Sequence, residues 1–129
     1  MSYTTSLPAA NSHFITVATA ASMTGRYRTN RETILATSYK GQDILPLSET
    51  FNRGDIDTLL SKTGCAGLRI YFGMDENLKI HSIIVAVNEN NEDILPAEST
   101  NSLLDDEDDV VEEGQRCPNL CPPPSPLNG

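Results

Sequence analysis

Five residues of this chain are of types that could support thiol or metal chemistry: Cys65, Cys117, Cys121, His13 and His81. Cys117 and Cys121 are four positions apart near the C-terminus, and each is followed by a proline. A zinc site needs about four clustered nitrogen or sulfur ligands, and a thioredoxin-like redox pair needs a closer spacing of its cysteines. Neither pattern is present, so the sequence predicts no catalytic residue, no cofactor site and no metal site.

The two C-terminal cysteines still allow more than one state. The default for an odd number of cysteines without secreted-scaffold spacing is a cytoplasmic protein with reduced thiols. The favoured interpretation is a tail that packs on the body of the protein, with each cysteine acting as a small apolar side chain. A local disulfide between Cys117 and Cys121 under oxidising conditions remains open, as does a thiol- or metal-dependent activity of the pair.

Three polar residues fall within a predicted β-hairpin: His81, Arg69 and Tyr71. If the connection is 74–77, His81 shares a face with Leu68, Ile70 and Ile83, whereas Arg69 and Tyr71 lie on the other face. A change of one residue in the loop reverses this assignment, because side chains alternate along a strand. We therefore expect a half-buried histidine with its hydrogen bonds satisfied, and no joint site of the three residues.

The net charge of −9 is concentrated in the C-terminal quarter. Residues 98–129 carry eight acidic residues and one basic residue, and residues 1–97 carry ten acidic and eight basic residues. An acidic chain without a basic stripe repels phosphates, so no nucleic-acid partner is expected. The run 105–113 lacks the spacing of a calcium loop and is interpreted as a solvated loop. Its charge also supports an alternative function, as an acidic inhibitor or immunity-like protein.

The N-terminal sequence predicts neither secretion nor membrane insertion. MSYTTSLPAA has no basic region, and the following FITVATAASM is short and rich in threonine. A signal peptide needs a basic start, and a membrane span needs about 20 apolar residues. We expect a cytoplasmic protein without a membrane partner.

The length of 129 residues is typical of one domain. Residues 1–12 are expected to be disordered or loosely attached, 13–97 to form an α+β domain, and 98–129 to form an acidic and then Pro/Cys-rich tail. Thr16 is a predicted N-cap of a helix that runs to about Thr29. Asn52 is a predicted N-cap of a second helix, which ends at Gly64.

Two hydrophobic segments, 68–72 and 78–87, predict an antiparallel hairpin. Residues 43–51 and 93–95 would extend it to three or four strands. The predicted fold class is therefore α+β, with a small antiparallel sheet of two to four strands packed against two helices. The unbroken apolar run 83–87 predicts that both faces are covered there, by a second copy or by the C-terminal tail.

Three runs of this sequence carry a family resemblance: GCAGLRIYFGMDE, NEDILP and GQRCPNLCPPPSPL. Over 43–96 and 114–127 the chain resembles a family of small uncharacterised proteins from Bacteroidetes-type bacteria. It departs from the family pattern at Lys62-Thr63-Gly64, where Pro-Gly is usual, and at Cys117-Pro118-Asn119, where a double proline is usual. The resemblance implies a bacterial cytoplasmic protein whose tail belongs with its hairpin, and it supplies no catalytic residues.

These observations favour a non-enzymatic interaction module that associates with itself or with another protein. The alternatives are a thiol- or metal-dependent protein using Cys117 and Cys121, and the acidic inhibitor. The sequence makes no prediction about a small-molecule ligand.

Overall fold

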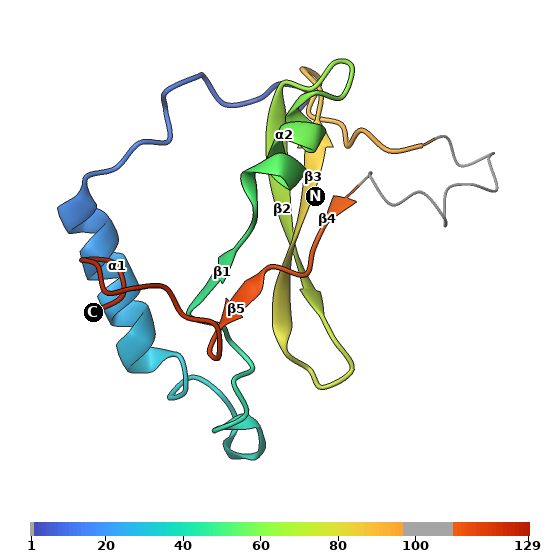
Figure 1. The fold of residues 1–129 in the computed structure, drawn as a ribbon. Helices are drawn as coiled ribbons and strands as arrows, with labels where there is room; N and C mark the ends of the chain where they lie inside the picture. The colour runs from blue at the N-terminus through green and yellow to red at the C-terminus, as the bar shows by residue number, and fades with distance from the viewer. Residues whose placement is uncertain (1, 97–109) are drawn as a thin grey trace. The chain divides into compact units, whose positions relative to one another are not determined.

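The computed structural model describes residues 2–96 and 110–129, and its elements are drawn in Figure 1. Within these ranges the chain is α+β, with two α-helices and two small antiparallel sheets, which confirms the predicted fold class. The chain divides into two compact units. The described residues of the first unit are 2–9, 51–73, 82–96 and 110–113, and those of the second are 10–50, 74–81 and 114–129.

The helix of the first unit, α2, spans Arg53–Leu60. Asn52 is its N-cap in an extended conformation, and the side-chain oxygen of Asn52 accepts a hydrogen bond from the Gly54 amide at 2.8 Å. Asp55 lies in the first turn, where a negative charge suits the helix dipole. Gly64 has a φ of 83°, the left-handed conformation that glycine adopts without strain. The predicted N-cap is therefore confirmed. The predicted end of the helix at Gly64 is wrong, because α2 ends at Leu60 and its C-cap is Ser61.

A three-stranded antiparallel sheet accompanies α2, in the order β2-β3-β4 (Figure 1). Its strands are β2 (Gly67–Met74), β3 (Ile80–Val87) and β4 (Val110–Val111). Ile84 pairs with Val111 and Val85 with Val110. The third strand therefore comes from the end of the acidic run, where two β-branched residues favour extended backbone. The segment 93–95 contributes only an isolated bridge between Val87 and Asp93.

The core of the first unit contains Leu59, Ile84 and Ala86, all buried. Around it pack the partly buried Phe51, Ile56, Cys65, Ile94 and Val111. Val85 and Val87 are also buried, so the run 83–87 loses solvent on both faces, as its sequence predicts.

At Val87, the residue that covers the second face of the run 83–87 is not the one that the sequence predicts. A Cβ added at Gly67 would lie 3.5 Å from the side chains of both Leu7 and Val87. Leu7 of the N-terminal segment therefore lies beside Val87, in a position that the sequence had assigned to a second copy or to the tail.

The second unit contains the helix α1 (Val17–Asn30) and the 3-10 helix η1 (Thr37–Tyr39). Thr16 is the N-cap of α1, as predicted, and its hydroxyl accepts a hydrogen bond from the Thr19 amide at 3.1 Å. None of the residues of α1 is fully buried. No helix in the described part of the chain is both long and apolar enough to cross a membrane.

A separate two-stranded sheet in the second unit joins β1 (Ser48–Thr50) to β5 (Gln115–Cys117). Ser48 pairs with Cys117 and Thr50 with Gln115. The expectation that 43–51 extends the hairpin sheet is thus wrong, because the partner of this segment is the C-terminal strand. Pro46 limits where this pairing can begin, because proline has no amide hydrogen to donate. The first hydrogen bond between the two segments is donated by the Leu47 amide to the Cys117 carbonyl at 2.8 Å.

Side chains of the second unit hold the segment before β1 through its carbonyl groups. The guanidinium of Arg116 donates to the carbonyls of Asp43 and Ile44 at 2.7 and 2.8 Å. Arg31 donates to the Leu45 carbonyl at 2.6 Å, and the Tyr27 hydroxyl donates to the Pro46 carbonyl at 2.6 Å. Backbone carbonyls that do not take part in a sheet are thus satisfied by charged and phenolic donors.

Candidate interaction surface

The two faces of the β2-β3 hairpin can be assigned from its glycines. A Cβ added at Gly73 would lie 2.6 Å from the Ile83 side chain, and one at Gly67 would lie beside Val87. Since side chains alternate along a strand, the odd-numbered positions of both strands share one face. The even-numbered residues of β2 therefore lie on the face where Ile84 and Ala86 join the core.

Three apolar side chains of β2 on this core face are exposed: Leu68 by 39%, Ile70 by 56% and Phe72 by 78%. We call these three residues the β2 stripe. On the neighbouring strand, Ile84 and Ala86 of the same face are buried. The helix α2 packs against β4, at the opposite side of the sheet from β2. A helix of eight residues thus covers one side of this face, and the stripe remains in solvent.

The stripe lies on an edge strand. In the sheet order β2-β3-β4, the described residues place no further strand beyond β2 (Figure 1). Natural edge strands are usually protected by charged side chains, proline or a bulge. The one charged residue of β2 is Arg69, which belongs to the other face. The apolar face of β2 therefore reaches the edge of the sheet without a charged side chain that would hinder pairing with another strand.

The opposite face of β2 carries a polar network. Arg69 forms an ion pair with Asp93 and hydrogen bonds with the side chain and the carbonyl of Asn91, the latter at 3.0 Å. The Tyr71 hydroxyl donates to the other carboxylate oxygen of Asp93. That hydrogen bond is the main cause that raises the pKa of Tyr71. Asn91 in turn donates to the Thr4 carbonyl at 3.0 Å. The network fixes β2 and neutralises the charge of Arg69.

For a connection at 74–77, the sequence placed His81 and Ile83 on the face of Leu68 and Ile70. The structure reverses this pairing of faces, because Ile83 lies beside Gly73 on the face of Arg69 and Tyr71, and His81 shares that face by alternation along β3.

The sequence did not identify Asp93 and Asn91 as the partners of Arg69 and Tyr71. The available signal was weak, since Asn91 lies within a polar turn and Asp93 reads as the start of a short strand. Asn91 has a φ of 65°, so its backbone is in the left-handed conformation, and this conformation sets the direction of its side chain.

The histidines have different surroundings in the second unit. The Nε2 of His81 lies 2.7 Å from Asp75, and 22% of the His81 side chain is exposed, so it is half-buried as predicted. His13 is exposed and precedes α1.

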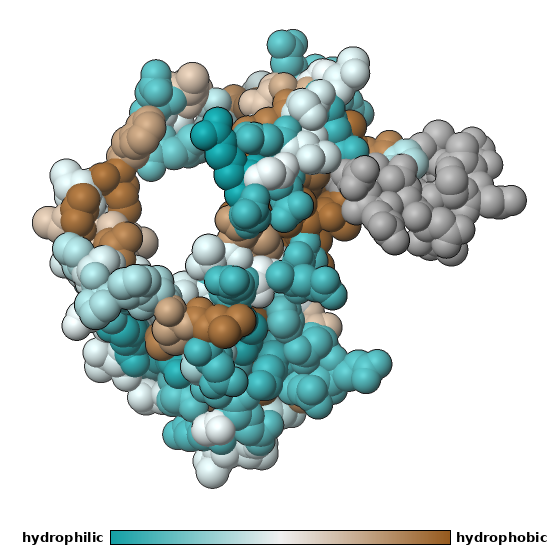
Figure 2. All heavy atoms as spheres, in the orientation of Figure 1, coloured by the Kyte–Doolittle hydropathy of each residue, from teal (hydrophilic) through white to brown (hydrophobic). Residues whose placement is uncertain are grey.

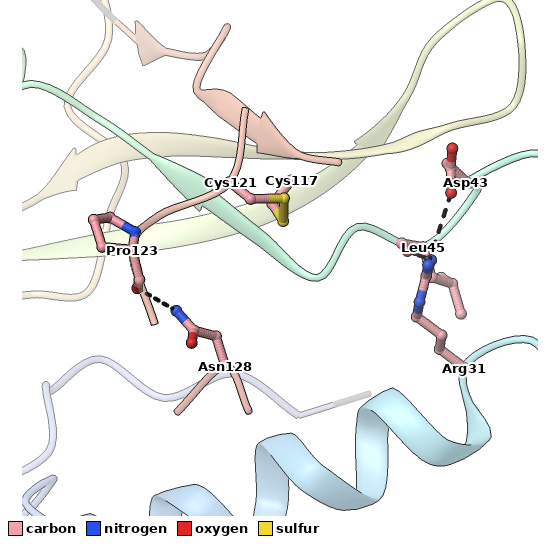
Figure 3. Close-up of a disulfide and its surroundings, with 7 residues drawn as sticks. All are labelled: Arg31, Asp43, Leu45, Cys117, Cys121, Pro123 and Asn128. Carbon is pink, nitrogen blue, oxygen red and sulfur yellow. Dashed lines mark hydrogen bonds and ion pairs between the residues drawn. A yellow bond between two sulfur atoms is a disulfide. The ribbon is translucent and has the colours of Figure 1, made fainter. Parts of the chain in front are cut away.

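The Cys117 and Cys121 sulfurs form a disulfide in the second unit (Figure 3). The expectation of reduced thiols is therefore wrong for this pair, and the alternative of a local disulfide is the form present. Cys117 is buried at the end of β5, whereas Cys121 is exposed. Neither can act as a thiolate metal ligand while this bond is intact. Cys65, in the first unit, is a free and partly buried thiol whose Sγ lies 3.3 Å from the Gly67 carbonyl.

The C-terminal segment after the disulfide is held by polar contacts within the second unit. Asn128 donates to the Pro123 carbonyl at 2.9 Å (Figure 3), and Arg28 of α1 donates to the Leu127 carbonyl at 2.9 Å. The predicted packing of the tail on the body takes this form for the described residues.

A second group of exposed apolar residues lies at the start of α1 in the second unit. Phe14 is 84%, Ile15 59% and Val17 64% exposed, and Figure 2 shows hydrophobic side chains at the surface there. These residues lie on a chain segment and a helix end. They lack the open strand edge that accompanies the β2 stripe.

Comparison with family models, with curated proteins and with solved structures finds no match. The resemblance to the Bacteroidetes-type family therefore stays a prediction. Most of the acidic run 105–113 lies outside the described residues.

Proposed function

We propose that this protein is a non-enzymatic interaction module that binds a protein strand at the edge of β2. The observation that carries the proposal is the β2 stripe, an alternating apolar face beside an open strand edge. In strand addition, backbone hydrogen bonds supply affinity, and alternate side chains supply specificity. Both components are present along the same seven residues, 67–73.

The energetics of the stripe support binding. Complete burial of a large apolar side chain contributes about 1.5–3 kcal/mol relative to exposure. Ile70 and Phe72 each expose more than half of their surface, so a partner strand would recover much of this contribution. The polar network around Asp93 keeps β2 extended before binding, which reduces the ordering cost.

The polar residues of the hairpin support a structural role in this module. Arg69 and Tyr71 both use Asp93 as their partner, and His81 uses Asp75. Their contacts position the strand and its turn.

The cellular compartment is part of the proposal. The sequence favours the cytoplasm, whereas persistent disulfides are typical of oxidising compartments. Thiol trapping in intact cells decides between them: Cys117 and Cys121 labelled as free thiols support the cytoplasm, and a protected pair contradicts it. The disulfide disfavours a metal-dependent activity that uses Cys117 and Cys121. No observation on the described residues favours the acidic inhibitor.

Site-specific photo-cross-linking in cells tests the interaction module. A photoreactive phenylalanine analogue replaces Phe72, and the same analogue at the exposed Glu89 is the control. We expect adducts of one defined protein at position 72 that disappear when Ile70→Lys is added. Equal labelling at both positions, unaffected by Ile70→Lys, would contradict the proposal.

A further inference from the structure

We infer that the strand bound at β2 is β2 of a second copy, paired antiparallel about a two-fold axis at Ile70. This inference rests on the proposed interaction module and names its partner. Its basis is the order of residues in β2, which reads Gly67-Leu68-Arg69-Ile70-Tyr71-Phe72-Gly73. Apolar, polar and glycine positions are arranged symmetrically on the two sides of Ile70.

An antiparallel pair centred on Ile70 would match each residue with a compatible one. On the stripe face, Ile70 meets the partner's Ile70 and Leu68 meets the partner's Phe72. Directly opposed apolar side chains on one face are the main stabilising pairs of antiparallel sheets. A two-fold interface requires a patch that is complementary to itself, and the stripe meets this requirement.

The charges of β2 favour a second copy. On the other face, Arg69 would lie opposite the partner's Tyr71, so no like charges are opposed. Arg69 already lies over its own Tyr71 ring, with 6.0 Å between the guanidinium carbon and the ring centroid. Its charge is also neutralised by Asp93. Two copies of an acidic chain can therefore approach along this strand without a local charge penalty.

The glycines at both ends of the segment fit the same arrangement. Gly67 and Gly73 would lie opposite each other across the axis. Neither has a positive φ, so both continue the extended strand. Two strands of this length bury less surface than the roughly 1,200 Å² of stable complexes, so the expected dimer is weak and concentration-dependent.

Sedimentation velocity of the purified full chain between about 1 and 200 µM tests the dimer, a range that brackets weak protein association. We expect a shift from monomer to dimer with rising concentration. Ile70→Lys should weaken dimerisation at least tenfold, because it opposes two positive charges at the axis. The matched control is Leu60→Lys on α2, where 49% of the side chain is exposed, and it should leave the dimer unchanged. A strict monomer, or equal effects of both variants, would overturn the inference.

Oxidative cross-linking tests the register in a Cys65→Ser background. Ile70→Cys would place the two new thiols opposite each other, within disulfide reach. Phe72→Cys would leave its two thiols four positions apart along the strands, about 13 Å, which is too far. We expect a covalent dimer from Ile70→Cys and little from Phe72→Cys. The reverse result would overturn this register.

The two proposals can fail separately. A strictly monomeric chain whose Phe72 probe captures a different protein in cells would overturn the second copy and leave the interaction module standing. A Phe72 probe that captures nothing above the Glu89 control would remove both.

Discussion

Replacing Leu59 with alanine should be strongly destabilising, and the adjacent Leu60 provides a matched control. Leu59 is fully buried, whereas Leu60 is 49% exposed on the same helix. Both changes alter the helix propensity of α2 equally. The difference between the two variants therefore isolates the contribution of packing against the sheet.

The expected magnitude follows from the surroundings of Leu59. Its side chain packs with Ile84 and Ala86, and partly buried neighbours such as Phe51 and Ile94 can move into the space it leaves. Buried leucine-to-alanine changes cost about 2–5 kcal/mol, and a site that can partly collapse falls below the top of that range, near 3 kcal/mol. For Leu60→Ala, burial of about half the side chain gives about 1 kcal/mol.

Urea denaturation followed by far-ultraviolet circular dichroism measures both variants. With a slope of about 1.5 kcal/mol per molar urea, Leu59→Ala should lower the midpoint by about 2 M. Hydrogen exchange of the β3 amides should rise in the same variant, because β3 carries the opposing side of the core. If Leu60→Ala is as destabilising as Leu59→Ala, the assignment of the core face of α2 is wrong.

Two further predictions concern the second unit. Cys121→Ser removes the disulfide and should destabilise the second unit by about 2 kcal/mol, the value expected for a closed loop of about five residues. Urea denaturation measures this loss of stability, with Cys65→Ser as the control. An unchanged stability of Cys121→Ser would contradict the prediction. Hydrogen bonds from His81 and from the amides of Lys79 and Asn77 lower the pKa of Asp75. Because the folded pKa lies below the unfolded one, this stabilisation is present above the ordinary pKa of about 4 and is lost as pH falls through the folded pKa. The protection factors of the Asn77 and Lys79 amides, which are corrected for the intrinsic exchange rate at each pH, should therefore fall on acidification below pH about 4. Those of Asp75→Asn should not fall, and identical profiles in the two proteins would refute the assignment.

The exposed apolar side chains of β2 could not be recognised as a binding surface from the sequence. A periodic apolar strand gives the same sequence signal whether a helix covers it or solvent does. Leu68, Ile70 and Phe72 alternate as regularly as the buried residues of β3. Only the position of the short α2 over β4 shows that the stripe lacks cover in the described chain.

Local signals in the sequence determined where the two α-helices begin. Thr16 and Asn52 cap their helices because their side-chain oxygens reach amides within the first turn, a contact that needs no distant residue. The sequence placed the end of the second helix at Gly64, whereas its C-cap in the structure is Ser61. The tertiary structure decided the pairings between distant segments: β1 with β5, β3 with β4, and Arg69 with Asp93. Short strands of three residues or fewer carry almost no sequence preference for a partner, so only the folded chain selects among them.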